Sequence, residues 1–201
     1  MTEDHLKPPV QQIVGAFIDS TVKLFAPTLH TTFTYGPEWF SDASREARTT
    51  GHSARRREIL FAVCAAESAL FEWVRDTVLH RDFVALAKFF PTRRKRGVAE
   101  KFRDIPKELV QQGCIATAFD CGGSEFSEFR RLVDYRDGLV HALASRPDRV
   151  DLPREQKPVP TKDELDALPP GWALTVVRAL LKKLHDDTGT DAPAWLEDGA
   201  R

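Results

Sequence analysis

The segment Arg136-Asp137-Gly138-Leu139-Val140-His141 places charged residues inside an otherwise apolar helical pattern. A helix is expected over residues 124–145, because Ser124 is a good N-cap after two glycines and the residue before Pro147 disfavours helical geometry. On a helix with about 100° per residue, Arg136 falls in the middle of the apolar arc. An unpaired buried guanidinium is unfavourable, so we expect Arg136 to have a carboxylate partner, face a groove or bind an anion.

A second helix, expected over residues 56–80, contains a matching acid. Its stripe of apolar residues at spacings of three and four is interrupted by Glu67. One buried acid can neutralise one buried base by forming an ion pair with it, so Glu67 is the candidate partner of Arg136. A structural ion pair between these two residues and a functional role for Arg136 are both open at this point.

His141 follows Arg136 by five residues in the sequence. It therefore lies about 140° further round the helix, on the polar border of the arc. Asp137 and Asp134 precede His141 by four and seven residues, so either carboxylate can orient the imidazole or raise its pKa. The plainer alternative is a surface histidine in an ordinary pair with Asp137. Arg136 and His141 act on one substrate only if the arginine reaches along its stem or a second copy of the helix lies opposite, which predicts a symmetric dimer.

The rest of the chain also follows helical periodicity, which predicts an all-α protein. We expect helices over residues 9–26, 83–90 and 98–112, the last interrupted near Pro106 and stopping at Gly113, with a loop and at most one short turn over 27–53. A proline-rich connection over 147–170 contains one capped turn from Thr161 to Glu164. A final amphipathic helix follows, and Trp195 and Leu196 are expected to hold the tail against the surface.

These elements divide the chain into an N-terminal helix and loop extension over 1–53, a helical bundle over 54–187 and a C-terminal tail over 188–201. The bundle is expected to have about four to five main helices. We expect three kinds of residue to be structural or solvated rather than functional. They are the solvent-facing His52, His80 and His185, the core Cys64, and the packing residues Trp73, Trp172 and Trp195.

Composition limits the function. The 29 Lys and Arg residues nearly balance the 30 Asp and Glu residues, so any binding site for a polyanion must be local. The three cysteines lack metal-ligand spacing and fit a reducing, cytoplasmic environment. The start of the chain lacks the basic and apolar regions of a signal peptide, and no apolar stretch approaches the length of a membrane span. We therefore expect a cytoplasmic protein with neither a metal site nor a membrane partner.

The segment from Leu132 to Ala142 resembles the signature of HEPN domains, in which an arginine and a polar residue precede a histidine by a fixed spacing. The segment from Ile59 to Glu72, with its small residues and embedded Glu67, is similar to the first core helix of the same families. The resemblance covers roughly residues 56–145 and implies a HEPN-like helical bundle.

The resemblance implies a metal-independent endoribonuclease of a toxin, antiphage defence or RNA-processing system. In such an enzyme the RNA 2′-hydroxyl attacks the adjacent phosphate, with His141 as general acid or base and Arg136 stabilising the phosphorane. Asp137 would hold one of the two side chains, and Glu67 and Asp134 would support them. No cofactor is implied. The partners implied are RNA, a second copy of the chain that completes a composite site, and an antitoxin protein.

Two basic runs are candidates for contact with RNA phosphates: Arg93-Arg94-Lys95-Arg96 and Arg55-Arg56-Arg57. Such runs are more often solvated loops than nucleic-acid sites. The alternative to an enzyme is a non-catalytic HEPN module that keeps the bundle for dimerisation and for binding nucleotides, RNA or a partner. A helical scaffold in which the arginine and histidine coincide by chance is a third, more distant hypothesis.

Overall fold

The computed structural model describes residues 35–78, 97–144 and 160–197, and every regular element within these ranges is a helix. The longer helices are α2 (Gly36–Ala47), α3 (His52–Val78), α5 (Val98–Gln111), α6 (Ser124–Ala144) and α8 (Trp172–Thr188), and the shorter ones are α7 (Lys162–Ala167) and α9 (Ala194–Glu197). The prediction of an all-α bundle is confirmed. The predicted helices over 9–26 and 83–90 lie outside the described residues.

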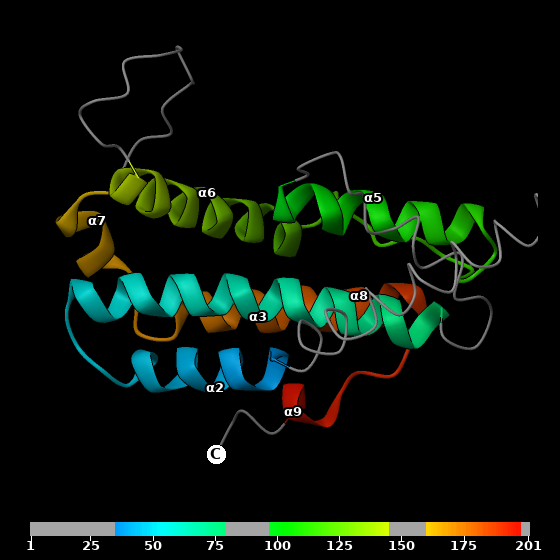
Figure 1. Ribbon diagram of the computed structural model, residues 1–201, viewed down its shortest axis with the longest axis horizontal. Helices are drawn as coiled ribbons and strands as arrows, with labels where there is room; N and C mark the ends of the chain where they lie inside the picture. Colours follow the sequence, from blue (N-terminus) through cyan, green and yellow to red (C-terminus); the bar gives the residue numbers. More distant parts are fainter. Residues whose placement is uncertain (1–34, 79–96, 145–159, 198–201) are drawn as a thin grey trace, which may run out of the picture.

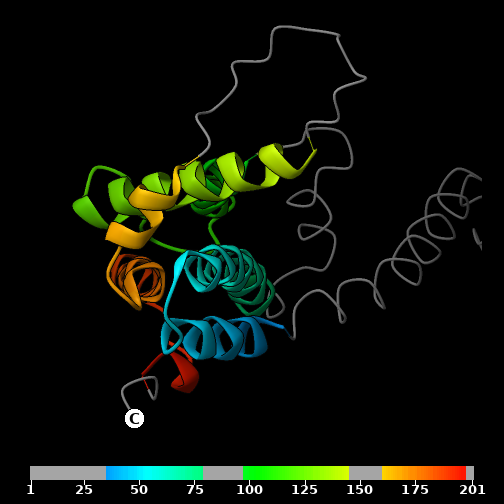
Figure 2. The same ribbon diagram turned by 90° about the vertical axis from the view of Figure 1, so that its left-hand side faces the viewer.

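The helices form three layers, with α3 and α8 side by side in the middle (Figure 1). α6 packs across both of them on one side, and α5 continues this layer roughly in line with α6. α2 packs against α3 and α8 on the opposite side. Figure 2, which looks along α3, shows the same order of layers. The middle pair therefore contacts helices on two opposite faces.

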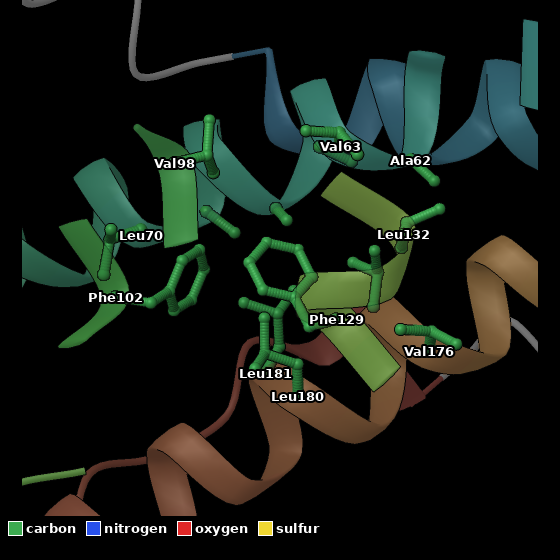
Figure 3. Packing of buried hydrophobic residues seen from close by; sticks show 14 of the residues in the cluster. Ala62, Val63, Leu70, Val98, Phe102, Phe129, Leu132, Val176, Leu180 and Leu181 are labelled. Carbon is green, nitrogen blue, oxygen red and sulfur yellow. The ribbon is translucent and has the colours of Figure 1, made fainter. Parts of the chain in front are cut away.

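Aliphatic and aromatic side chains from the four helices α3, α5, α6 and α8 meet in one core (Figure 3). Phe102 of α5 and Phe129 of α6 meet edge to face, with ring centroids 5.0 Å apart. Burial of each such large side chain stabilises the fold by about 1.5–3 kcal/mol. Around these two rings lie Ala62, Val63, Leu70, Val98, Leu132, Val176, Leu180 and Leu181.

The expected loop over 27–53 is wrong for residues 36–47, which form α2. Pro37 stands in the first turn of this helix, where a missing N–H is harmless and the fixed φ favours helix formation. Phe40 and Ala43 enter the core, and the ring of Trp39 stacks on Phe61 of α3 at 5.6 Å. The proline begins a helix here and does not break one.

α5 runs without interruption through Pro106, contrary to the expected break. Pro106 is buried beside Ile105 and Leu109, and this burial offsets the backbone hydrogen bond that proline lacks. The predicted stop at Gly113 is confirmed. Gly113 has φ +69°, and the N–H groups of Gly113 and Cys114 donate to the carbonyls of Val110 and Leu109, each at 2.9 Å, in a Schellman motif.

A buried ion pair joins the beginning of α3 to the beginning of α8. Arg55 Nη1 lies 2.5 Å from Glu58 Oε2, and the two side chains are 6% and 1% exposed. The Glu58 carboxylate also accepts the N–H of Ala173 at 3.0 Å and that of Gly171 at 3.4 Å, so it caps α8 from another helix. Arg55 is thus a structural residue, and the expectation that it contacts RNA phosphates is wrong.

One further helix boundary is formed as predicted, and at a second the helix begins where expected but the predicted N-cap residue is wrong. The capping box from Thr161 to Glu164 is present, with the Glu164 N–H donating to Thr161 Oγ1 at 3.2 Å and the Thr161 N–H donating to Glu164 Oε2 at 2.6 Å. Ser124 is the first residue of α6 and not its cap, because the Gly123 carbonyl already accepts the Ser127 N–H at 3.3 Å. The tail packs as predicted, since Leu196 is buried and Trp195 meets Phe40 at 5.3 Å.

Candidate functional site

The predicted catalytic residues Arg136, Asp137 and His141 all lie on α6, in its C-terminal half. Arg136 Nε is 3.2 Å from Asp137 Oδ1, and the two side chains are 26% and 24% exposed. Arg136 is therefore half-buried at the edge of the core and not sealed inside it. The backbone of His141 continues the helix, and its side chain lies outside what the structure describes.

The Arg136 guanidinium is incompletely satisfied. Its Nε atom is inaccessible to solvent and has no hydrogen-bond partner of suitable geometry, although the Asp137 carboxylate is close enough for an ion pair. A guanidinium carries five N–H donors, so one carboxylate beside it leaves donors for a further acceptor. This arrangement suits a side chain that receives an anionic group.

Glu67, the expected partner of Arg136, instead forms an ion pair with Lys101 of α5. The ammonium of Lys101 also lies over the Phe71 ring, 5.1 Å from its centroid. Glu67 thereby links α3 to α5. The ion pair of Arg136 is made with Asp137, the residue next to it in the sequence.

Cys64 of α3 lies within electrostatic reach of both charged residues. Partial desolvation raises the pKa of the Cys64 thiol, the negative charge of Glu67 raises it further, and Arg136 opposes the rise. The thiol is exposed and free, so the expectation that Cys64 belongs to the core is wrong. Its raised pKa keeps it in the less reactive protonated form near neutral pH.

The remaining predicted residues lie on α6, on α3 or outside the described residues. Asp134 is exposed on α6, and Arg93, Arg94, Lys95 and Arg96 lie outside the described residues. In the second basic run, Arg57 forms an ion pair with Glu46 of α2 at 2.9 Å, and Arg56 is exposed. Within this run, Arg56 is thus the residue whose surroundings leave it most available to a phosphate.

Sequence reasoning missed the environment of His185, which was expected to face solvent. It is only 8% exposed, and burial lowers its pKa against the opposing effects of Asp186, Asp191 and the Thr190 backbone. The α8 stripe that predicts Leu181 and Leu184 as buried also places position 185 beside them, so the signal was present. Trp73 and Trp172 pack as predicted, Trp172 against Tyr135 with centroids 5.7 Å apart.

Two properties of the described residues bear on function. No three or more His, Cys, Asp or Glu side chains among them are arranged to hold a metal ion. Within the same residues, no helix combines the length and the apolar character that crossing a bilayer requires. The chain has no significant match among protein-family models, curated proteins or solved structures. The HEPN resemblance therefore rests on the residues of α3 and α6 alone.

Proposed function

We propose that this protein is a metal-independent endoribonuclease of the HEPN type, working in a toxin, antiphage defence or RNA-processing system. The substrate's 2′-hydroxyl attacks the neighbouring phosphate, His141 transfers the proton as general base or acid, and Arg136 stabilises the extra charge of the phosphorane. Asp137 holds Arg136 in place through their ion pair. A histidine titrates near neutral pH, which suits both proton-transfer roles.

The observation that carries this proposal is the state of Arg136. The acid best placed in the sequence to neutralise it, Glu67, is engaged by Lys101. Arg136 retains 26% exposure of its side chain and a buried Nε without a hydrogen bond. A purely structural arginine is expected to be saturated, as Arg55 is by Glu58 and the Thr49 carbonyl. The partly exposed Arg136 side chain can still offer guanidinium N–H donors to a phosphate oxygen.

The active site would be composite, built from two copies of the chain. Arg136 and His141 differ by about 140° around the helix, so one α6 cannot direct both at a single phosphate without bending the arginine stem. Figure 2 shows the C-terminal end of α6 projecting beyond α3 and α8. Val140, between the two motif residues, is 39% exposed, which is unusual for a large apolar side chain on this molecule. A second α6 packing there would cover Val140 and supply the opposing residues.

The test is RNA cleavage by the purified full chain in EDTA, analysed for 2′,3′-cyclic phosphate ends. We expect His141→Ala to lower the rate by about 10²–10⁴-fold, the usual contribution of general acid–base catalysis, with an unchanged melting temperature. The matched control is His52→Ala, a histidine on α3 that is not part of the motif, which should cut at the wild-type rate. Relief of toxicity on expression by His141→Ala would agree with this result. Unchanged cleavage by His141→Ala would rule out the assignment.

A non-catalytic HEPN module is the second candidate, and the Arg136–Asp137 ion pair is the observation that favours it. If Asp137 occupies the arginine permanently, the bundle can still dimerise and bind RNA or a partner. In that case the folded protein binds RNA in a salt-dependent manner without cutting it, and Asp137→Asn does not restore cleavage. Light scattering at micromolar concentration gives the oligomeric state, and a monomer would remove the composite site from both candidates.

A further inference from the structure

A cavity is lined by residues from the C-terminal half of α3, the C-terminal end of α8 and the segment that leads to α9, and by none from α6. Figure 1 shows where these elements lie in the bundle. Its volume is about 550 Å³, which is within the range of small-molecule sites. The lining combines three carboxylates, a histidine, hydroxyl groups and two indoles with small apolar surfaces. The residues used below are Glu72, Trp73, Asp76, His185, Asp191 and Trp195.

A chain of hydrogen bonds forms one wall of this cavity. Thr190 Oγ1 accepts the indole N–H of Trp73 at 3.1 Å, lies 2.9 Å from His185 Nδ1 and lies 3.1 Å from Thr188 Oγ1. Thr188 in turn donates its hydroxyl proton to the carbonyl of Leu184 at 2.6 Å. The Thr190 hydroxyl therefore has to donate its proton to Thr188, because Thr188 has none left to give.

When every contact in this chain is a hydrogen bond, the count of protons leaves one tautomer for His185. With its own proton directed at Thr188, Thr190 can only accept from the imidazole, so Nδ1 carries the hydrogen. Burial lowers the pKa of His185 and keeps the ring neutral. The other ring nitrogen, Nε2, then carries no hydrogen and has a lone pair. His185 is more than nine-tenths buried and lines the cavity. Its Nε2 can accept a hydrogen bond but cannot donate one.

The carboxylates of the cavity are also acceptors. Glu72 accepts the backbone N–H of Gly36 at 3.2 Å. Its pKa is raised to about 7, mainly because the carboxylate is partly desolvated, with smaller contributions in the same direction from the negative charges of Asp76 and Glu38. The Gly36 hydrogen bond and the positive charge of Arg75 oppose this rise. Asp76 pairs with Arg75 at 2.8 Å, and Asp191 is exposed. None of the described lining residues is Lys or Arg. The cavity thus offers acceptors and negative charge, with no resident cation on its wall.

We propose that this cavity binds a small organic cation with N–H donors, either an alkylammonium or a guanidinium compound. The cation would donate to Glu72 and to Nε2 of His185, with Asp76 and Asp191 adding negative charge at the mouth. Trp73 and Trp195 would cover the alkyl part of the ligand, as aromatic side chains do in cation sites. A metal ion is a poorer occupant, because the described acids and histidine are not grouped to coordinate one.

The test is isothermal titration of the full chain with agmatine, which carries both cationic groups, alongside n-butylamine and the neutral n-butanol. We expect saturable binding of agmatine, at least about tenfold tighter than n-butanol, because a hydrogen bond from a charged donor to a carboxylate is stronger than one from a neutral hydroxyl. Glu72→Gln and Asp191→Asn should each weaken agmatine binding, by about tenfold and about threefold. The matched control is Glu128→Gln on α6, which should bind agmatine as the wild type does.

Acidity gives a second readout. Because Glu72 ionises near pH 7, agmatine should bind more tightly at about pH 8.5 than at about pH 5.5, and Glu72→Gln should remove most of this difference. The proposal is overturned if agmatine and n-butylamine fail to bind the folded protein at millimolar concentration. It is also overturned if n-butanol binds as tightly as the cations, or if both acid variants keep wild-type affinity. The outcome of this binding experiment does not depend on the outcome of the nuclease assay, since no residue of α6 lines the cavity.

Discussion

The two ends of α3 each hold a carboxylate, buried at Glu58 and partly buried at Glu72, and the two differ in the number of hydrogen-bond donors around them. Near the N-terminal end, Glu58 has a guanidinium and two backbone N–H groups around it. Near the C-terminal end, Glu72 has one backbone N–H, from Gly36, and its pKa is raised to about 7. The difference shows that burial alone does not make a charged residue structural. A carboxylate whose oxygens are surrounded by hydrogen-bond donors, which we call saturated, holds helices together. One with few donors around it, which we call unsaturated, can still take up a proton or a ligand.

The largest expected effect on stability comes from removing the Glu58 carboxylate, near the N-terminal end of α3. Glu58→Ala leaves Arg55 buried without a partner and α8 without its cap, so the free energy of unfolding should fall by about 3–5 kcal/mol. The melting temperature should fall by roughly 10 °C in a thermal scan. Arg56→Ala, at the exposed neighbouring position, should stay within about 0.5 kcal/mol. Equal stability of these two variants would contradict the contrast between the ends of α3.

The contribution of Glu72, near the C-terminal end of α3, to the free energy of unfolding should depend on pH. The folded pKa of Glu72 is above its ordinary value of 4.5, so between about pH 4.5 and about pH 7 the folded state binds more protons than the unfolded state. The contribution of Glu72 is therefore full at the acidic end and is lost as the pH rises to about 7, by on the order of 1 kcal/mol after allowance for solvent. Chemical denaturation at several pH values should show a loss that Glu72→Gln removes. The same loss in the variant would assign it to another group.

The middle of α3 supplies the smallest effect. Glu67 and Lys101 are both partly exposed, so Lys101→Ala should lower the free energy of unfolding by only about 0.3–1 kcal/mol. Lys107→Ala, on the exposed face of the same helix α5, is the matched control and should change it less. If Lys101→Ala lowered the free energy of unfolding by more than about 3 kcal/mol, Glu67 would belong in the same structural class as Glu58.

Much of the bundle was predictable, because the apolar spacing of α3, α5, α6 and α8 directly encodes which face is buried. The errors came from prolines and from single positions. The prediction of a loop over 27–53 overlooked that a proline in the first turn, here Pro37, also begins helices, and that Phe40 and Ala43 carry the spacing that marks α2. Pro106 was expected to interrupt α5, yet its buried neighbours outweigh one missing hydrogen bond.

The candidate site was predictable in position and not in pairing. The helix wheel placed Arg136 at the edge of a core and identified it as anomalous, and the structure finds it half-buried and incompletely satisfied. That Glu67 does not pair with Arg136 could not be deduced, because the residue that engages Glu67 is Lys101, on another helix 34 positions away. Likewise, the hydrogen bond from the Trp73 indole to Thr190 joins two residues that are 117 positions apart. Such long-range contacts leave no local pattern in a single sequence.

The cap that Glu58 supplies to α8 also bears on how the chain can be divided. Donor and acceptor are 113 and 115 positions apart, and Gly171 at the start of α8 offers no side chain to cap its own helix. Cutting the chain between α6 and α7 would separate an acid from the amides it binds and leave each fragment with unmet polar groups at the break. The two fragments should be poorly soluble alone and should recover structure on mixing, so this protein is a candidate for complementation by split halves.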